Sequence, residues 1–378
     1  MLERDIYDLV DKALFKGKVI IITGARQTGK TTFLKQLASG KNAEDILFLN
    51  CDEPDIRSQL ENVTSARLRV LIGSHKFVLI DEAQRVENIG LTLKLIIDNI
   101  GGVQIIATGS SAFDLRNKLN EPLTGRKFEF HLYPFSTGEL IKQSSVTEER
   151  RLLEQRLIYG MYPDIVNNPS DAPVILRELS NSYLFKDVFS YRDIRNPDGL
   201  TRLLTALALQ LGSEVSYNEL GRTLGIDKET VERYLELLEK VFVIFRLRSF
   251  SRNVRNELKK SRKVYFYDNG IRNTIINNFN PFQLRNDIGA LWENFIISER
   301  RKYLDYHGLY AETFFWRTHT QQEIDYLEER EGKLFAYEFK WDENKKPVIP
   351  PKFSSGYPEN SFYEVINPGN YLEFLTQA

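Results

Sequence analysis

The first third of the chain alternates short apolar runs with amphipathic stretches. Four runs stand out, KVIIIT, DILFLN, KFVLID and VQIIATGS, which begin at residues 18, 45, 76 and 103. Each run is apolar throughout rather than alternating, which is typical of strands buried on both faces of a parallel sheet. Helical patterns lie between the runs, and this alternation predicts an α/β fold with a parallel sheet.

Composition indicates the broad class of the protein. Of the 378 residues, 42% are hydrophobic and 27% charged, as expected for a folded chain of about two or three domains. The formal net charge of −1 neither favours nor excludes a nucleic-acid partner. The single cysteine, Cys51, excludes an internal disulfide framework and a cysteine-based zinc cluster.

The sequence shows no targeting signal and no membrane span. The N-terminal stretch MLERDIYDLVDKALF is charged and lacks the apolar core of a signal peptide. No apolar run approaches the roughly 20 residues that a transmembrane helix requires. The four histidines lack the spacing of a metal-binding motif. We therefore expect a cytoplasmic protein with no membrane partner.

The segment GARQTGKTT follows the first apolar run and precedes a helical pattern. It fits the phosphate-loop motif G-x-x-x-x-G-K-[ST] in the expected strand–loop–helix context. The two glycines let the backbone turn its N–H groups toward phosphate oxygens, and the following helix adds the positive end of its dipole. Lys30 is predicted to contact the β- and γ-phosphates and to assist catalysis, and Thr31 to bind Mg²⁺. The predicted nucleotide-binding residues are Gly24, Ala25, Arg26, Gln27, Thr28, Gly29, Lys30, Thr31 and Thr32.

Two adjacent carboxylates, Asp81 and Glu82, follow the third apolar run. An acid at the carboxyl end of a buried parallel strand lies at the edge of the sheet where ligands bind. We predict that Asp81 holds Mg²⁺, directly or through water, and that Glu82 polarises the attacking water.

Weaker candidates follow the fourth run. Thr108, Ser110 and Ser111 lie at its end, and any of them could contact the γ-phosphate or the water. Arg126, after Gly125, is a candidate for stabilising the transition state, either in the same chain or from a neighbouring subunit. The alternative for Arg126 is a surface arginine at the start of a strand.

The segments GARQTGKTT, VLIDEAQ, TGSS, LTGR and GMYPDIV resemble a large prokaryotic group of AAA+-type P-loop ATPases that carry a C-terminal domain of unknown function. The resemblance covers essentially the whole chain. It implies ATP rather than GTP as the nucleotide, and the sequence has no convincing N-K-x-D motif for reading guanine. No clear lid arginine of the kind found in many AAA+ proteins is recognisable, so the formation of an oligomer stays open.

The spacing of apolar residues is helical after the ATPase domain and up to about residue 240. Helices are predicted at about 199–211, 216–224 and 228–240, with Gly225 at a turn and Asp227 as an N-cap. Two strands follow, which completes a winged helix-turn-helix. GMYP, at 160–163, is predicted to form a break between two helices and to join the ATPase core to its lid. The predicted domains are 1–145 for the ATPase, 146–198 for a helical lid or connector, 199–270 for the winged helix and 271–378 for a nuclease-like α/β domain.

A basic run lies along the two strands of the predicted wing, between residues 246 and 263. On a wing, such a run would contact DNA phosphates and make binding depend steeply on salt. A solvated hairpin is the plainer alternative, and a winged helix can also bind a protein partner. The cations of the run are Arg246, Arg248, Arg252, Arg255, Lys259, Lys260, Arg262 and Lys263.

The C-terminal part predicts a helix followed by a hairpin that turns at EREGK. Strand alternation places Asp325 so that it can meet Glu338 and Lys340, which share a face of the next strand. The spacing D-x₁₂-E-x-K resembles the core of restriction endonucleases, and Glu293 matches the additional helical acid of resolvase-like members. We therefore predict that Glu293, Asp325 and Glu338 bind a metal, and that Lys340 positions the hydroxide. The alternative is an amphipathic hairpin with salt-bridged surface charges.

Three functions are compatible with these patterns. The first is an ATP-driven DNA-processing enzyme that also cleaves DNA. The second is a nucleotide-controlled DNA-binding switch whose nuclease-like domain is structural. The third is a regulatory ATPase that binds a protein partner through its winged helix.

Overall fold

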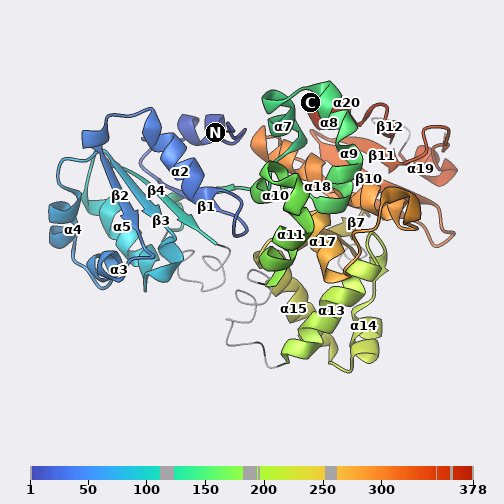
Figure 1. Cartoon of the computed structure of the whole chain (residues 1–378), viewed down its shortest axis with the longest axis horizontal. Coiled ribbons are helices and arrows are strands. Elements are labelled where there is room, and N and C mark those ends of the chain that lie inside the picture. The colour runs from blue at the N-terminus through green and yellow to red at the C-terminus, as the bar shows by residue number, and fades with distance from the viewer. Residues whose placement is uncertain are drawn as a thin grey trace. The chain divides into compact units, whose positions relative to one another are not determined.

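The computed structural model describes residues 2–110, 123–181, 194, 196–251, 262–345, 347–357 and 361–376. The chain forms two compact units, Met1–Phe135 with Lys240–Phe242, and Ser136–Glu239 with Val243–Ala378 (Figure 1). The first boundary therefore precedes the predicted one at 145/146. The physical reason is that α7 (Thr137–Gln143) packs against α8 (Val146–Arg151) and α20 (Tyr371–Thr376) of the second unit.

A parallel sheet forms the centre of the first unit, as the apolar runs predict. Its strand order is β2-β3-β4-β1-β5, and every neighbouring pair is parallel. The strands are β1 (Val19–Thr23), β2 (Ile46–Asn50), β3 (Phe77–Asp81), β4 (Gln104–Gly109) and β5 (Lys127–His131). Because all strands run in one direction, the residues that follow β1, β3 and β4 meet at one edge of the sheet.

Helices flank this sheet (Figure 1). One face buries alternate strand residues such as Val19 and Ile21 in a core shared with α3, α4 and α5, whereas α2 packs against β3 and β4. Strand side chains alternate between the two faces, so covering both faces explains why β1 to β4 are largely apolar along their length. The helices are α1 (Tyr7–Lys12), α2 (Lys30–Ser39), α3 (Pro54–Leu60), α4 (Ser65–Ile72) and α5 (Ile89–Asn99).

The short segment Lys240–Phe242 belongs to the first unit although it comes late in the chain. The Phe242 ring lies 5.3 Å from the ring of His131 and 6.3 Å from that of Tyr133. Phe242 also has a positive φ of 56°, which is uncommon for a bulky residue.

The second unit begins with a series of short helices. Three later helices, α13, α14 and α15, match the predicted ranges to within about two residues. Gly225 has a φ of 68° at the predicted turn, and Asp227 caps α15 by accepting a hydrogen bond of 2.6 Å from the Thr230 N–H. The further helices are α9 (Leu153–Tyr159), α10 (Pro163–Asn167), α11 (Ala172–Ser180), α13 (Pro197–Leu209), α14 (Tyr217–Leu224), α15 (Lys228–Lys240), α17 (Asn269–Ile275), α18 (Ile288–Tyr306) and α19 (Pro351–Gly356).

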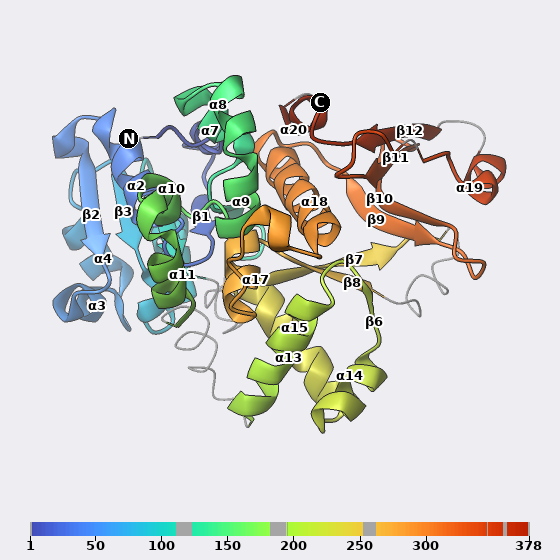
Figure 2. The same ribbon diagram turned by 45° about the vertical axis from the view of Figure 1, so that its right-hand side comes forward.

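A seven-stranded sheet runs through the second unit in the order β12-β11-β10-β9-β7-β8-β6. Helix α18 packs against β8 and β11 of this sheet (Figure 2). Since β7 pairs with both β8 and β9, the predicted wing and the predicted C-terminal domain share one sheet. The separation expected between residues 270 and 271 therefore has to be corrected. The strands are β6 (Glu214–Val215), β7 (Ile244–Ser249), β8 (Arg262–Phe266), β9 (Glu312–Arg317), β10 (Glu323–Arg330), β11 (Lys333–Phe339) and β12 (Ser361–Ile366).

The predicted C-terminal hairpin is formed by β10 and β11. They pair antiparallel, from Tyr326 opposite Tyr337 to Arg330 opposite Lys333. The turn residues Glu331 and Gly332 both have positive φ, as a tight two-residue hairpin requires. Among the helices of the described residues, none is both long enough and apolar enough to span a membrane.

Candidate functional site

The phosphate loop leaves β1 at a place where only glycine fits. A Cβ atom on Gly24 would lie 2.2 Å from the carbonyl oxygen of Leu132, which is far inside van der Waals contact. The same residue, Leu132, donates its N–H to the Thr23 carbonyl at 2.7 Å. The first glycine of the motif thus allows β1 and the segment after β5 to approach each other closely.

The loop then turns through two left-handed residues, Gln27 with a φ of 59° and Gly29 with a φ of 94°. Lys30 begins α2 and is buried, with only 5% of its surface exposed. Its Nζ donates to the carbonyls of Gly24 at 3.1 Å and Ala25 at 2.8 Å, so the amine lies over the loop backbone. Lys30, which is predicted to contact the phosphates, is therefore held next to the loop whose N–H groups are predicted to bind them.

Three elements bring the predicted magnesium ligands together. The Thr31 hydroxyl at the start of α2 donates to Oδ2 of Asp81 at 2.6 Å. The Thr108 hydroxyl of β4 donates to Oδ1 of the same carboxylate at 2.5 Å. Asp81 is 4% exposed at the end of β3, so both carboxylate oxygens are oriented by hydroxyls in a buried setting.

This donor set suits Mg²⁺. Thr31 and Asp81 supply hard oxygen atoms within hydrogen-bond distance of each other, and Mg²⁺ typically binds one or two such protein groups together with substrate phosphates and water. Within the part of the chain that the structure describes, no three His, Cys, Asp or Glu side chains are grouped to hold a metal. A site built from one carboxylate, one hydroxyl and phosphate oxygens does not need such a group.

Glu82 lies beside this network in a strained backbone conformation. Its φ of 51° and ψ of 40° are left-handed, which is costly for a residue with a side chain and is frequent at functional sites. Its N–H donates to the Thr108 hydroxyl at 3.2 Å, and its carboxylate accepts a hydrogen bond from Gln84 Nε2 at 2.5 Å. The fold thus holds the predicted water-polarising group at the same edge of the sheet as Asp81.

The candidates after β4 and at β5 are placed differently. Thr108 is the member of its group that joins the Asp81 network, whereas Ser110 is buried just after β4 and Ser111 lies outside the described residues. Arg126 precedes β5, where its carbonyl bonds the Val19 N–H at the beginning of β1, and its guanidinium pairs with Asp98 at 2.8 Å. The phosphate loop follows the other end of β1. A role for Arg126 at the nucleotide of its own chain is therefore wrong, and only a role toward a neighbouring subunit stays a prediction.

A second candidate site lies on the C-terminal hairpin. Lys340 Nζ is 3.2 Å from Oδ2 of Asp325 and 2.7 Å from Oε2 of Glu338. The Phe339 N–H also donates to Asp325 Oδ2 at 2.9 Å. The strand register thus brings together the three residues that alternation predicted.

Glu293 of α18 has other partners. Its Oε1 accepts hydrogen bonds from the Tyr265 hydroxyl at 2.6 Å and from Lys263 Nζ at 3.2 Å. Lys263 also pairs with Glu323 at 2.6 Å. No three metal-binding side chains of the described residues are grouped to hold a metal, although burial and the charge of Asp325 raise the pKa of both Glu293 and Glu338. The predicted ligand set of Glu293, Asp325 and Glu338 therefore stays a prediction. The contacts of Glu293 with Tyr265 and Lys263 could not be predicted, because these two residues belong to β8, about 30 residues before Glu293 in the chain.

Burial and neighbouring charge raise the pKa values of two acids at this site, Glu338 and Glu293. Desolvation, and secondly the negative charge of Asp325, raises the pKa of Glu338 to about 7, while Lys340 opposes the shift. Burial likewise raises the pKa of Glu293, and the Lys263 ammonium opposes that rise. A carboxyl group that titrates near neutral pH can exchange a proton in its working range, which is typical of acid–base sites.

The basic run is only partly available to a nucleic acid. Arg246 is largely buried and bonds Glu239 and Tyr217, and Lys263 is 3% exposed within the carboxylate site. The prediction that these two side chains contact DNA phosphates is therefore wrong, since both neutralise interior acids. Arg248 is exposed and pairs with Glu312 at 3.1 Å, and Arg262 is half-buried. Arg252, Arg255, Lys259 and Lys260 lie outside the described residues.

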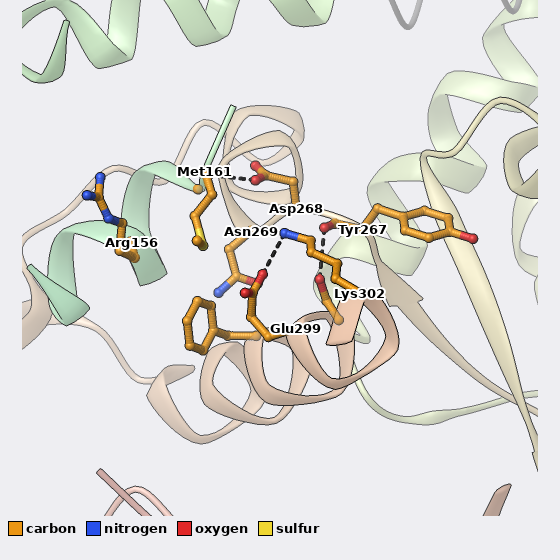
Figure 3. A pocket seen from close by; sticks show the side chains of 10 residues that line it. Arg156, Met161, Tyr267, Asp268, Asn269, Glu299 and Lys302 are labelled. Carbon is orange, nitrogen blue, oxygen red and sulfur yellow. Dashed lines mark hydrogen bonds and ion pairs between the residues drawn. The ribbon is translucent and has the colours of Figure 1, made fainter. Parts of the chain in front are cut away.

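The GMYP segment breaks α9 from α10, as predicted, and it lies against a small polar cavity (Figure 3). A Cβ atom on Gly160 would lie 2.0 Å from Oδ1 of Asp268, and the Met161 N–H donates to the other Asp268 oxygen at 2.7 Å. Glu299 and Lys302 form a buried ion pair at the same cavity. The cavity measures about 10 Å³, which is close to the space of one water molecule, so it is no substrate site.

The strand order of the first unit, with a phosphate loop after β1 and an acid after β3, is that of a P-loop nucleotide-binding domain. In agreement, a family model described as "AAA domain" matches residues 16–141. Two models described as domains of unknown function, DUF8612 and DUF4143, match residues 150–281 and 288–371. The first unit is thus similar to an AAA domain, and the models that match the rest of the chain suggest no activity for it.

The chain is similar to several proteins described as uncharacterised. It is 27% identical to Rv2008c of Mycobacterium tuberculosis over 342 residues, which cover 89% of this chain and 73% of the relative. It is 25% identical to MJ1544 of Methanocaldococcus jannaschii over 339 residues, which cover 84% of this chain and 74% of the relative.

Similar solved structures include the Orc1 protein of Aeropyrum pernix in complex with DNA, with a TM-score of 0.34 and 12% identity over 74% of this chain and 93% of that chain. Cdc6p of Pyrobaculum aerophilum gives a TM-score of 0.28 and 12% identity over 72% of this chain and 91% of that chain. Both TM-scores are too low to support a conclusion about the function of this chain.

Proposed function

We propose that the protein is a Mg²⁺-dependent ATPase that couples its nucleotide state to DNA binding. The observation that carries the ATPase is the buried network in which Thr31 and Thr108 orient the two oxygens of Asp81 directly beside the phosphate loop. Such a network serves the binding of a hydrated cation next to phosphates.

Each residue of the site has a distinct part in this proposal. Lys30 leaves the loop carbonyls and neutralises the β- and γ-phosphates, while loop N–H groups bind their oxygens. Mg²⁺, held by Thr31 and Asp81, would supply charge neutralisation at the phosphates when bound. Glu82 accepts a hydrogen bond from the attacking water and orients it toward the γ-phosphate.

The proposed DNA-binding module is the winged helix predicted for residues 199–270. β6 lies between α13 and α14 in the chain, α15 follows α14 directly, and β6 and β7 both pair antiparallel with β8. β7 and β8 are the two strands of the predicted wing. The exposed residues of α15 are of mixed charge, including Lys228, Glu229 and Arg233, so contacts to DNA phosphates rather than base reading would dominate binding.

Coupling between nucleotide and DNA has a physical route in the segment that follows α15. Residues 240–242 pack within the first unit, where the Phe242 ring contacts His131. His131 Nδ1 lies 2.7 Å from the Thr23 hydroxyl, at the last residue before the phosphate loop. Lys240 is also the last residue of α15, so the segment that contacts His131 is continuous in the chain with the proposed DNA-contacting helix.

Removing the cations of the wing tests the DNA-binding part. Changing Arg252, Arg255, Lys259 and Lys260 to alanine should weaken binding to all duplex sequences alike and flatten the dependence of affinity on salt, since each lost phosphate contact lowers the slope by about one. Fluorescence anisotropy of labelled duplexes from low to moderate salt measures both effects. ATP turnover with and without DNA shows whether coupling is lost as well.

The matched control replaces four cations of the first unit, Lys12, Lys16, Arg67 and Lys76. This variant loses the same net charge and should keep the salt slope of the wild type. Equal affinity of the wing variant and the wild type at low salt would instead favour a protein partner for the winged helix.

A second candidate function is metal-dependent cleavage of DNA at the hairpin. The observation that favours it is the convergence of Asp325, Glu338 and Lys340, with Lys340 bonded to both carboxylates. Asp325 and Glu338 offer two hard oxygen ligands, and a divalent metal bound there would activate water for attack on a phosphodiester. Lys340 would hold the hydroxide or the scissile phosphate.

Changing Asp325 to asparagine should abolish scission of branched, duplex or single-stranded DNA in Mn²⁺, because the neutral side chain keeps its shape but loses its charge for the metal. Lys340→Ala should have the same effect. Glu329→Gln, at an exposed position of the same strand, is the control and should cleave like the wild type. If the wild type cleaves none of these substrates, the domain is structural and the protein is a nucleotide-controlled switch.

A further inference from the structure

A buried arginine outside every recognised motif contacts the phosphate loop. Arg4 is 4% exposed, and its Nη1 donates to the Thr28 carbonyl at 2.8 Å. Its Nη2 donates to the Tyr133 carbonyl at 2.6 Å, and the guanidinium lies 5.1 Å above the Phe135 ring. Burying a guanidinium is costly unless its donors are bonded, so these partners explain why this charge is tolerated in the interior.

The contact with Thr28 fixes the orientation of a peptide plane. The bond between Thr28 and Gly29 is a trans peptide, in which the C=O and the following N–H point in opposite directions. Because Arg4 draws the Thr28 carbonyl to its own side, the Gly29 N–H is directed away from Arg4. The φ of 94° at Gly29 then leads the chain into α2.

Leu132 and Tyr133, the two residues that follow β5, contact the two ends of the loop, Leu132 directly and Tyr133 through Arg4. The Leu132 carbonyl lies against Gly24 at the beginning of the loop, where a Cβ would be 2.2 Å away. The Tyr133 carbonyl is linked through Arg4 to Thr28 near its end. Arg4 thus links the second half of the loop to Tyr133, whereas the first half of the loop contacts Leu132 directly.

We infer that Arg4 is a positioning residue of the nucleotide site, which orients the Gly29 N–H toward the β-phosphate by holding the Thr28 carbonyl. This inference rests on the proposed nucleotide binding at the loop. Arg4 acts through the loop backbone, and the interaction that it prepares is made equally with ATP and ADP, since both carry a β-phosphate.

Replacing Arg4 with methionine keeps an unbranched side chain that reaches as far as the arginine Nε but removes both Nη donors. The dissociation constants of ATP and ADP with Mg²⁺ should rise by about tenfold or more and to a similar degree, because an interaction common to both nucleotides is lost. The turnover number should change by less than about threefold, as expected for a loss of uniform binding. Arg4→Lys retains one charged donor and should recover part of the affinity.

Titration calorimetry, steady-state kinetics and hydrogen exchange of the segment 26–34 measure these effects, well below the unfolding temperature. A purely structural role would lower the unfolding temperature but would leave the dissociation constants and the exchange of this segment unchanged. The matched control is Arg57→Met, because Arg57 also bonds two carbonyls, those of Cys51 and Asp52, neither of which belongs to the loop.

ATP binding by the wild type and by Lys30→Ala distinguishes a failure of the proposed nucleotide site from a failure of the inference about Arg4. If the wild type binds no ATP, or if Lys30→Ala binds it equally well, the proposed function is wrong. If those two proteins behave as expected and Arg4→Met binds ATP as tightly as the wild type, the inference about Arg4 is overturned. Should Arg4→Met not fold, the dissociation constants of Arg4→Lys decide by the same criterion.

Discussion

Alanine in place of Lys30 is expected to abolish tight ATP binding and, with it, ATP turnover. The buried Lys30 amine lies over the loop backbone, bonded to the Gly24 and Ala25 carbonyls, and it is the cation best placed to neutralise the β- and γ-phosphates. Losing charge-assisted hydrogen bonds to phosphate should reduce ATP affinity by at least about 100-fold. Titration calorimetry with Mg²⁺ and ATP, and phosphate release under saturating ATP, measure the two effects.

The control is Lys35→Ala, an exposed lysine of the same helix, which should behave like the wild type. Circular dichroism verifies that both variants fold. Wild-type turnover by Lys30→Ala would contradict the assignment of the loop as the nucleotide site.

Glutamine in place of Glu82 should separate binding from hydrolysis. The carboxylate of Glu82 is proposed to polarise only the attacking water, so ATP should bind with wild-type affinity while hydrolysis slows by about 100-fold or more. Glutamine keeps the size of the side chain, and the backbone N–H of this position can still donate to Thr108. Single-turnover hydrolysis together with a binding titration measures the two quantities separately.

Glu87→Gln changes an exposed acid of the same segment and should leave both quantities unaltered. An equal loss of ATP affinity and of hydrolysis in Glu82→Gln would show that Glu82 supports the structure of the site rather than the chemical step.

The nucleotide site could be predicted in detail because its information is local. The spacing from Gly24 to Thr31 encodes the loop, and the apolar run before Asp81 encodes a strand that delivers its acid to the ligand-binding edge of the sheet. Parallel strands place their carboxyl ends together, so Thr31 and Asp81 had to meet once the fold class was known. The hairpin was predictable for the same reason, since alternation and a short turn fix which side chains of adjacent strands face each other.

Side chains whose partners come from distant segments could not be predicted. Lys263 belongs to a basic run in the sequence, yet its side chain is buried and pairs with Glu293 of α18 and Glu323 of β10, which it neutralises. A run of charged residues in the sequence does not show which of its side chains are buried, because burial is decided by the helices and strands that pack over them.

The sequence by itself determined the α/β class, the phosphate loop, the acid after β3 and the carboxylates of the hairpin, because each depends on neighbours in the chain or on the period of a strand. Only the tertiary structure decided that Arg126 lies at the far end of β1, that Lys263 pairs with Glu293 and Glu323, and that Arg4 contacts the loop. These placements depend on the order of strands in the sheets and on close packing between segments more than about 20 residues apart, for which a single sequence contains no local signal.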